Sequence, residues 1–530
     1  MPTLEWTGKD KVINHHQDVP YRVLERQYTY LGHGQTGEEI PDGNKIIHGD
    51  NLEALKALLP QYEGRIKCIY IDPPYNTGNE NWVYNDNVND PKIKKWLGQV
   101  VGKEGEDLSR HDKWLCMMYP RLKLLQRLLA NDGAIFISIG DNENANLKLI
   151  CNEIFGEGNF IDTVIWQKIY TIKNSAQYFS GMHDYIVVYA RNKDYFHRNL
   201  LPRTEKLNKS YTNPDNDPRG PWITNAVQAR NFYAQGSYKI FSPSGREFLP
   251  PSGTYGRVSQ ETFKALDSDN RVWWGQNGNS IPRIKKFLSE AKQGVVPSTL
   301  WLHTDAGQNA DAKQEIRDIF HDGNEIFNTP KPTRLIERIL QIASNSDSII
   351  LDSFAGSGTT AHAVLNMNKA DGGHRKFILV EMMDYAETIT AERVRRVIDG
   401  YGEGKNAVEG TGGSFSYYEL GQSLMHADHT LNEDVPTEKI RQYVYFMETK
   451  QPMGQVNQGE PYLLGRHKNA AYYFYYEKEQ ATILNHNFLA TVQTKAENYV
   501  IYADLCTLSE EELQGVHITF KKIPRDISKL

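Results

Sequence analysis

The sequence predicts a doubly wound, mostly parallel α/β sheet that carries an inserted β-rich module and a small α/β carboxyl-terminal domain. Short apolar runs alternate with helical patterns from about residue 45 to 190 and again from 331 to 398, which is typical of such a sheet. Between these stretches helical periodicity fades, while Pro, Gly, Ser and aromatic residues become frequent. A glycine-rich stretch at 401–413 precedes the last segment.

The elements of the sheet domain follow in order. In the first half we expect strands at 45–48, 68–71, 134–139, 160–166 and 185–189, and helices at 52–59, 113–130 (with a kink at Pro120) and 144–155. In the second half we expect helices at 331–343, 361–367 and 388–398, and strands at 348–351 and 376–380. In the last segment we expect strands at 471–476, 499–503 and 516–520, and a helix beginning at Ser509.

Five parts follow from this pattern. They are an irregular amino-terminal arm (1–40), two halves of the sheet domain (41–194 and 326–400), the inserted module (195–325), and an interaction or dimerisation domain (401–530). In the arm, we expect His15 and His16 to be solvated.

The inserted module differs from the rest of the chain in charge. Residues 201–300 hold 14 Lys and Arg against 8 Asp and Glu, whereas the whole chain carries a net charge of −6. Basic residues interleaved with aromatic ones suit contacts with nucleic acid. The alternative is that most of these rings form the core of a small β-rich domain.

The composition indicates a soluble globular protein, with 39% hydrophobic and 24% charged residues. The first ten residues lack the apolar core of a signal peptide, and no run of about 18 apolar residues suggests a membrane span. We therefore expect a cytoplasmic protein without a membrane partner. The four cysteines have no metal-ligand spacing, so we expect reduced thiols and neither a metal site nor disulfides.

The first candidate site is the sequence Asp72-Pro73-Pro74-Tyr75, which directly follows an apolar strand. The two prolines restrict the backbone to a stiff, extended tip at the carboxyl end of that strand, where open α/β sheets bind ligands. A carboxylate, unclaimed backbone carbonyls and an aromatic face are the groups needed to hold a planar amine. The tetrapeptide alone is equally compatible with a surface turn.

The second candidate site follows the strand at 348–351. Asp352 to Thr360 reads Asp-Ser-Phe-Ala-Gly-Ser-Gly-Thr-Thr, a helix follows, and Glu381 ends the next strand. This is a nucleotide-binding arrangement, in which Glu381 can bind both ribose hydroxyls. The spacing Gly356-x-Gly358-x-x-Ala361 also fits the relaxed dinucleotide pattern, so an NAD oxidoreductase is an alternative. A P-loop is excluded because no Gly-Lys-Ser/Thr follows.

The two sites together resemble a known family. Asp-Pro-Pro-Tyr resembles the catalytic motif of the DNA amino-methyltransferases, and residues 352–360 resemble their S-adenosylmethionine motif. A dehydrogenase would not need Asp-Pro-Pro-Tyr, so the pair favours a methyltransferase. The catalytic motif comes first and the cofactor motif about 280 residues later, which is similar to the β group of this family.

Further stretches look like the Mod subunit of type III restriction–modification systems. They are residues 48–52, 328–332, 242–251 and 294–301. The resemblance implies double-stranded DNA as substrate, a homodimer, and a Res helicase–endonuclease partner; the sequence itself contains no helicase motif. Alternatives are a solitary DNA adenine methyltransferase, a cytosine-N4 methyltransferase, and a catalytically silent nucleic-acid-binding relative. By this reading the long polar segment at 76–111 closes on DNA.

The resemblance also implies a role for each site residue. Asp72 and the Pro73 carbonyl would accept the two N6 hydrogens of a flipped-out adenine, with Pro74 stiffening the tip and Tyr75 stacking on the purine. Asp rather than Ser at position 72 favours adenine N6 over cytosine N4. S-adenosylmethionine would be bound by Asp50 (its adenine), by Lys331 and Thr333 (its methionine end), and by Asp352, Phe354, Ala355, Gly356, Ser357, Gly358, Thr359, Thr360 and Glu381.

Overall fold

The computed structural model divides into two compact units. It describes residues 3–38, 40, 43–77, 110–292, 294–321, 326–426, 428, 430–454, 459–524 and 527. The larger unit comprises Met1–Asn199 and Ser298–Leu530, and the smaller one is Leu200–Pro297. Most of the segment 76–111, which we expected to close on DNA, lies outside the described residues.

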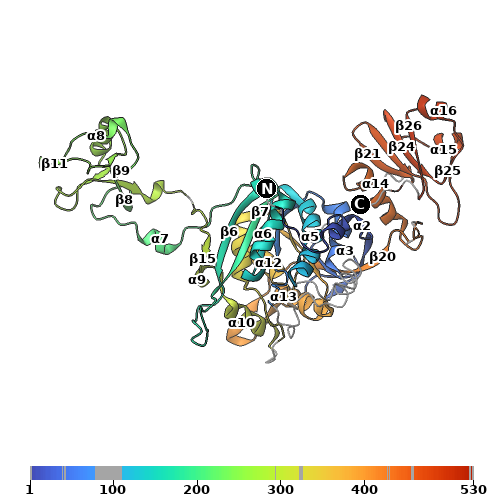
Figure 1. Cartoon of the computed structure of the whole chain (residues 1–530), viewed down its shortest axis with the longest axis horizontal. Helices are drawn as coiled ribbons and strands as arrows, with labels where there is room; N and C mark the ends of the chain where they lie inside the picture. The colour runs from blue at the N-terminus through green and yellow to red at the C-terminus, as the bar shows by residue number, and fades with distance from the viewer. Residues whose placement is uncertain are drawn as a thin grey trace. The chain divides into compact units, whose positions relative to one another are not determined.

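A mixed, mostly parallel sheet forms the centre of the larger unit (Figure 1). Its described strands, in spatial order, are β15 (Leu300–Trp301), β6 (Phe160–Gln167), β7 (His183–Ala190), β5 (Leu129–Ile139), β4 (Ile66–Ile71), β16 (Ile349–Asp352), β17 (Lys376–Glu381), β3 (Lys45–His48), β20 (Phe415–Ser423), β1 (Arg22–Tyr30) and β2 (Gln35–Thr36). From β5 to β20 all neighbours are parallel, whereas β7 and β1 run antiparallel to both of their neighbours. The predicted fold class is confirmed.

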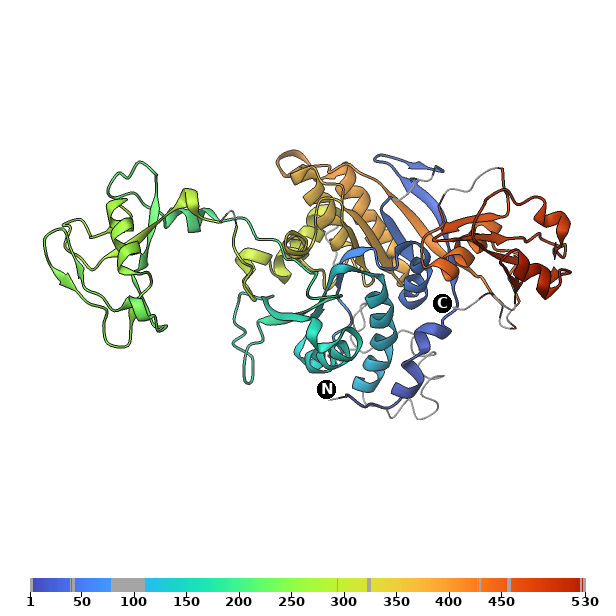
Figure 2. The same cartoon turned by 90° about the horizontal axis from the view of Figure 1, so that it is seen from above.

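Helices cover both faces of this sheet (Figure 2). On one face α3, α5 and α6 pack against one another, and on the other α11 packs on α12 and α12 on α13. Apolar residues recur along β4 because such a strand is buried on both sides. The described α-helices of this unit up to residue 449 are α1 (Lys9–Val12), α2 (His15–Asp18), α3 (Asn51–Tyr62), α5 (Arg110–Leu128), α6 (Asp141–Phe155), α9 (His303–Ala306), α10 (Asn309–Phe320), α11 (Thr333–Ala343), α12 (Thr359–Asp371), α13 (Glu392–Asp399) and α14 (Thr437–Thr449).

The sheet extends further in sequence than we expected at both ends. Within the expected irregular arm, residues 22–30 form β1, and beyond the expected boundary at residue 400, residues 415–423 form β20. The two strands pair with each other, and β20 also pairs with β3. His16, which we expected to be solvated, is buried. The arm was misjudged because a polar strand at a sheet edge lacks an apolar run.

The smaller unit is a β-rich module with its own core. Its elements are α7 (Glu205–Lys209), β8 (Trp222–Ala226), β9 (Gln228–Ala229), β10 (Ile240–Phe241), β11 (Glu247–Phe248), β12 (Tyr255–Gly256), α8 (Gln260–Ser268), β13 (Val272–Trp273) and β14 (Arg283–Phe287). Trp274 and Phe263 belong to the core, whereas Phe232 and Phe241 are exposed. The unit is shorter than the predicted 195–325, because α9 and α10 belong to the larger unit.

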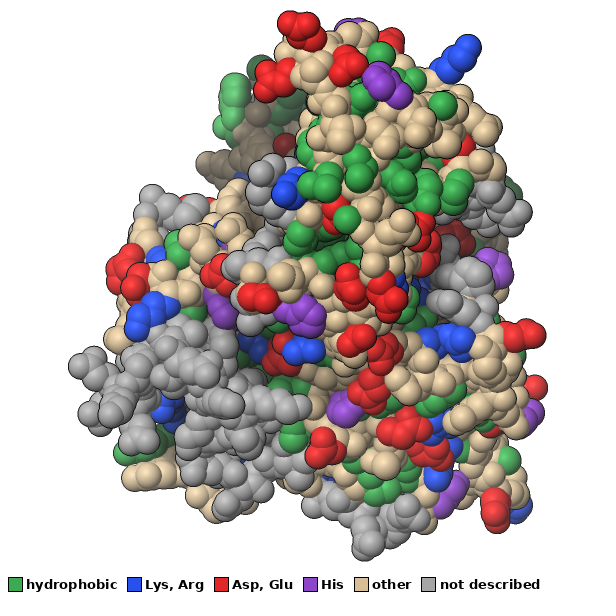
Figure 3. All heavy atoms as spheres, turned by 90° about the vertical axis from the view of Figure 1, so that its right-hand side faces the viewer, with side chains coloured by type: hydrophobic (Ala, Val, Ile, Leu, Met, Phe, Trp, Pro, Cys, Tyr) green, Lys and Arg blue, Asp and Glu red, His purple; other side chains and the backbone are tan. Residues whose placement is uncertain are grey.

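A second, smaller sheet lies near the carboxyl end of the chain. Its order is β21 (Leu463–His467), β22 (Ala470–Phe474), β24 (Asn498–Ala503) and β26 (Ile518–Lys522), accompanied by β23 (Ile483–Leu484), β25 (Leu505–Cys506), α15 (His486–Leu489) and α16 (Glu510–Gly515). Ser509 caps α16 through a capping box, as predicted. A hairpin of β18 (Gly400–Tyr401) and β19 (Val408–Glu409) occupies the predicted linker. Figure 3 shows acidic side chains spread over the face seen there.

In the described part of the chain, neither the cysteines nor the helices indicate a further functional site. The four cysteines are free, and Cys506 alone is not fully buried. No group of three His, Cys, Asp or Glu side chains among the described residues is placed to hold a metal ion. None of the described helices combines the length and hydropathy that crossing a bilayer requires.

Candidate active site

The sheet brings the two predicted motifs to the same edge. Strands β4 and β16 are parallel neighbours, with Cys68 opposite Ile350 and Ile69 opposite Leu351. Asp72 directly follows β4, and Asp352 is the last residue of β16. Because parallel neighbours end at one edge about 4.8 Å apart, motifs separated by some 280 positions in sequence face a common pocket.

The loop after β16 is shaped by two glycines. Gly356 has φ +53° and Gly358 has φ +79°, values that L side chains rarely adopt. A Cβ on Gly358 would also lie 3.1 Å from the carbonyl oxygen of Thr390. This tight turn places the amino terminus of α12 directly behind the loop, with backbone N–H groups and a partial positive charge available to a ligand.

Asp352 organises the start of this loop. One of its carboxylate oxygens accepts from the backbone N–H of Phe354 (3.0 Å) and the other from the hydroxyl of Thr360 (2.5 Å). Burial raises the pKa of Asp352 to about 7. The carboxyl group thus ties the strand end to the first turn of α12.

A buried arginine supports the loop from behind. Arg393 donates to the hydroxyls of Ser357 (3.0 Å) and Thr359 (2.8 Å), and it pairs with Glu315 at 3.4 Å. The hydroxyl of Thr359 in turn donates to the backbone carbonyl of Lys331 (3.1 Å). These bonds fix the positions of α13, the glycine loop and the segment before α11 relative to one another.

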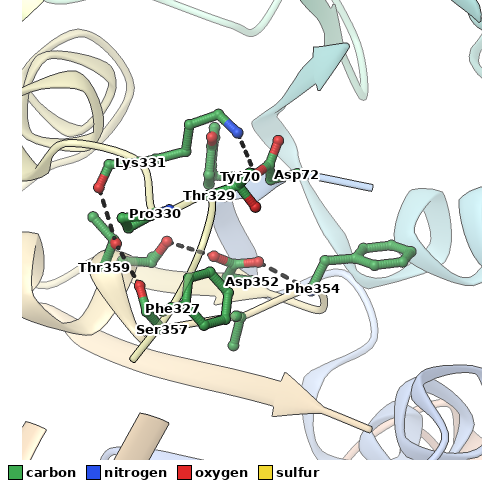
Figure 4. Close-up of a pocket in the computed structure, with 13 residues that line it drawn as sticks. Tyr70, Asp72, Phe327, Thr329, Pro330, Lys331, Asp352, Phe354, Ser357 and Thr359 are labelled. Carbon is green, nitrogen blue, oxygen red and sulfur yellow. Dashed lines mark hydrogen bonds and ion pairs between the residues drawn. The ribbon is translucent and has the colours of Figure 1, made fainter. Parts of the chain in front are cut away.

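The first pocket lies between this loop and the strand end at Asp72 (Figure 4). Nine residues predicted from the sequence line it: Asp72, Lys331, Asp352, Phe354, Ala355, Gly356, Ser357, Thr359 and Thr360. Four others were not predicted: Tyr70, Phe327, Thr329 and Pro330. Thr329 and Pro330 lie within the stretch 328–332 that resembles the Mod subunits, whereas Tyr70 and Phe327 carried no sequence signal beyond an apolar pattern.

Three of the predicted cofactor residues have other partners in the structure. Asp50 caps α3 by accepting from the N–H groups of Leu52 and Glu53. The hydroxyl of Thr333 donates to Glu315 (2.9 Å).

Glu381 is also engaged. It accepts from the backbone N–H groups of Gly356 (2.7 Å) and Met383 (3.0 Å), and burial raises its pKa to about 7. Four predicted cofactor residues are not among those that line the first pocket: Asp50, Thr333, Gly358 and Glu381.

The Asp-Pro-Pro-Tyr tip is held from α5 and α6. The indole N–H of Trp114 donates to the carbonyl of Pro74 (2.7 Å). The side-chain amide of Asn76 donates to Glu143 (2.5 Å) and to the carbonyl of Arg110 (3.1 Å). No described residue donates to the carbonyl of Pro73. The tip thus leaves the Pro73 carbonyl available to a ligand.

Asp72 forms an ion pair with Lys331 at the boundary of the first pocket. The ammonium also lies 5.1 Å from the centroid of the Tyr75 ring. Burial raises the pKa of Asp72, while Lys331 opposes this rise. Oδ1 of Asp72 and the hydroxyl of Tyr75 are buried without a hydrogen bond of ordinary geometry in the described structure.

A second, larger pocket of about 420 Å³ opens on the other side of Asp72 and Lys331. The sequence-predicted residues Pro73 and Tyr75 line it, together with Thr77, Lys168, Ile169, Lys173, Asp184, Asn309, Lys313, Asn328, Thr329 and Pro330. Lys168 pairs with the buried Asp184 (2.6 Å), and sequence reasoning assigned neither residue. Asp72, Thr329, Pro330 and Lys331 are common to both pockets, so the pockets adjoin.

Two adjoining pockets suit two ligands that react with each other. The first offers a glycine loop and a helix amino terminus, and the second offers a carboxylate, a carbonyl and an aromatic ring. Residues 66–392, which include both, match the family described as DNA methylase. The chain belongs to the DNA methylase family.

Relatives of this DNA methylase include type III Mod subunits. The chain is 37% identical over 367 residues to the StyLTI Mod subunit of Salmonella typhimurium LT2, covering 66% of this chain and 53% of that protein. It is 30% identical over 427 residues to the EcoP15I Mod subunit of Escherichia coli, covering 72% and 64%. The chain thus spans between half and two-thirds of the length of these Mod subunits.

A shorter relative is covered more completely. The chain is 30% identical over 351 residues to the type II methyltransferase M.KpnI of Klebsiella pneumoniae, and the matched region covers 64% of this chain and 80% of that protein.

Proposed function

We propose that this DNA methylase transfers a methyl group from S-adenosylmethionine to N6 of a flipped-out adenine in duplex DNA, as the modification subunit of a type III system. The observation that carries the proposal is the pair of pockets that share Asp72 and Lys331. One pocket suits a nucleoside-like donor and the other a planar base. The names of the Mod relatives support the assignment to a type III system.

The first pocket fits the cofactor on structural grounds. A Cβ on Gly356 would lie 3.2 Å from the ring of Phe327, and one on Gly358 would lie 3.1 Å from the Thr390 carbonyl oxygen, so the turn is tight. Glycines in such a turn expose backbone N–H groups to a ligand. Lys331 supplies a cation for the carboxylate of a methionine moiety. When bound, S-adenosylmethionine supplies an electrophilic methyl group on a sulfonium. Ribose binding by Glu381 would require its carboxylate to share or release the Gly356 N–H.

In the second pocket Asp72 and the Pro73 carbonyl accept the two hydrogens of the adenine amine. Two acceptors in this geometry localise the nitrogen lone pair, which in free adenine is delocalised into the ring. The face of Tyr75 stacks on the purine and fixes its plane. These residues would therefore accelerate methyl transfer mainly by positioning the adenine and by electrostatic stabilisation.

The remaining parts of the chain have proposed roles of their own. The unit Leu200–Pro297 is the target-recognition module, a role supported by its excess of basic residues and by the exposed rings of Phe232 and Phe241. The small sheet near the carboxyl end is an interaction domain for a second copy. A Res subunit would be the restriction partner, and the expected location is the cytoplasm.

A solitary methyltransferase is the second candidate function. It is supported by one observation: the chain is also 30% identical over 351 residues to M.KpnI, whose name describes a type II methyltransferase. A neighbouring helicase–nuclease reading frame, and copurification of its product with this chain, would distinguish the type III system from the solitary enzyme.

The test is methyl transfer by variants of Asp72. We expect Asp72→Ala and Asp72→Asn to lose transfer of label from tritiated S-adenosylmethionine to unmodified DNA, while calorimetry shows cofactor binding retained. The exposed Asp194→Ala is the control and should transfer normally. Mass spectrometry of digested DNA separates N6-methyladenine from N4-methylcytosine. Normal transfer by both Asp72 variants would refute the assignment.

A further inference from the structure

The loop between β6 and β7, residues 168–182, lines the second pocket with three of its residues and presents aromatic side chains to solvent elsewhere. Tyr178 is 83% exposed and Phe179 is 95% exposed, the highest value among the large apolar side chains described. Tyr170 and Ile172 in the same loop are also exposed. Burying such side chains against a partner is favourable, so this cluster marks an interaction surface.

The loop is ordered by its own hydrogen bonds. At its base the N–H groups of Lys168 and Ile169 donate to the carbonyl of Met182 (3.0 and 3.3 Å). Nearer the tip the N–H of Lys173 donates to the hydroxyl of Ser180 (2.9 Å). The loop therefore extends from the ends of the two strands as a hairpin (Figures 1 and 2), and the aromatic pair lies within the stretch that the Lys173–Ser180 hydrogen bond closes.

The same loop forms a wall of the second pocket, which we propose binds the target base. Lys168, Ile169 and Lys173 line the second pocket, whose other walls include Asp72 and Tyr75. Residues 168–182 contain two lysines and no acidic residue, but Lys168 pairs with Asp184, so Lys173 is the cation that the loop offers to a phosphate backbone. A surface with this charge, continuous with a pocket for a base, identifies the occupant as the duplex from which the base comes.

We propose that Tyr178 and Phe179 insert into the DNA duplex beside the target nucleotide and occupy the space that the flipped base leaves. The proposal rests on the function proposed above. Apolar side chains inserted between base steps compensate for lost stacking, which is the main cost of extruding a base. Lys173 would contact a flanking phosphate while the base enters the second pocket.

The test uses the full chain and a duplex with 2-aminopurine at the target adenine, the site having been identified by modified-base sequencing. We expect Tyr178→Ala/Phe179→Ala to lower the base-flipping fluorescence about tenfold, since stacking on an aromatic ring is worth that much or more. A mismatch opposite the target should restore flipping, because extrusion then costs less. The control is Tyr195→Ala, which removes another exposed ring outside the loop.

Each remaining outcome is decisive. If the double variant gives the same fluorescence as the parent chain, the proposed insertion of Tyr178 and Phe179 is wrong. The methyltransferase assignment then stands, provided the parent methylates DNA. If sedimentation shows that the double variant loses dimerisation instead, the loop is a contact between copies, and the proposed insertion into DNA is wrong. If the double variant loses base flipping and the mismatch does not restore it, the two rings contribute to general DNA affinity. This outcome also overturns the proposed insertion. If the parent neither flips nor methylates, both proposals fail.

Discussion

The ammonium group of Lys331 pairs with the carboxylate of Asp72 across the boundary of the two pockets. One residue belongs to the segment before α11 and the other to the end of β4. In the proposed reaction this lysine holds the catalytic carboxylate ionised against the effect of burial. It is also the cation available to the donor's carboxylate, so it serves both ligands.

Removing this cation should shift the pH dependence of methyl transfer. Burial raises the pKa of Asp72 and Lys331 lowers it, so in Lys331→Met the pKa rises further. The ionised carboxylate then predominates only at higher pH, and the acidic limb of the kcat profile should move upward. Lys173→Met, which removes a second-pocket cation without an ion pair to Asp72, should leave the limb in place. An unshifted limb in Lys331→Met would contradict the role of the pair.

The turn at Gly358 should control cofactor affinity. Gly358→Ala imposes a left-handed conformation on a residue with a Cβ, costing about 1–2 kcal/mol, and it crowds Thr390. We expect S-adenosylmethionine to bind about tenfold more weakly by calorimetry. Gly372→Ala has a similar φ of +69° and open space around the Cβ, at the far end of α12. It should lower the melting temperature without changing affinity, and equal loss of affinity in both variants would refute the prediction.

Asp352 should make the protein less stable as pH rises. Its pKa is about 7 in the folded chain and near 3.8 when exposed, so the folded state binds the extra proton between these values. This contribution to stability is present below about pH 4 and is lost as pH rises to about 7. We therefore expect Asp352→Asn to gain stability relative to the parent over that range, measured by urea unfolding.

Asp371 provides a control of opposite sign. Its hydrogen bond with Arg375 lowers its pKa, so its contribution is present at neutral pH and is lost as pH falls. Asp371→Asn should therefore cost stability at pH 7 and less at acidic pH. The same pH trend in Asp352→Asn and Asp371→Asn would show that burial does not govern Asp352.

Most elements of the central sheet could be predicted from local pattern. Strands β4, β5, β16 and β17 are apolar runs bounded by turn residues, and α11 shows clear helical periodicity. The cofactor loop was recognisable because its glycines lie close together in sequence. Strands β1 and β20 were missed because their pairing partners lie far away in sequence: they pair with each other, and β20 also pairs with β3.

Site residues outside the motifs depended on tertiary contacts. Tyr70, Phe327 and Asp184 come from three separate segments and line the pockets only because the sheet gathers them. The burial of His16 and the engagement of Glu381 with Gly356 likewise depend on neighbours distant in sequence.

The sequence by itself determined the chemical groups: the acid and prolines at one strand end, the glycine turn at another, and the family that combines them. Local backbone restrictions of Pro and Gly are enough for that, because they act within a few residues. Only the tertiary structure decided that Asp72 meets Lys331 between two adjoining pockets, and that the β6–β7 loop lines the second pocket while exposing Tyr178 and Phe179. The first relationship depends on the parallel pairing of β4 with β16, whose register no short stretch of sequence specifies. The loop instead joins β6 and β7, which pair antiparallel.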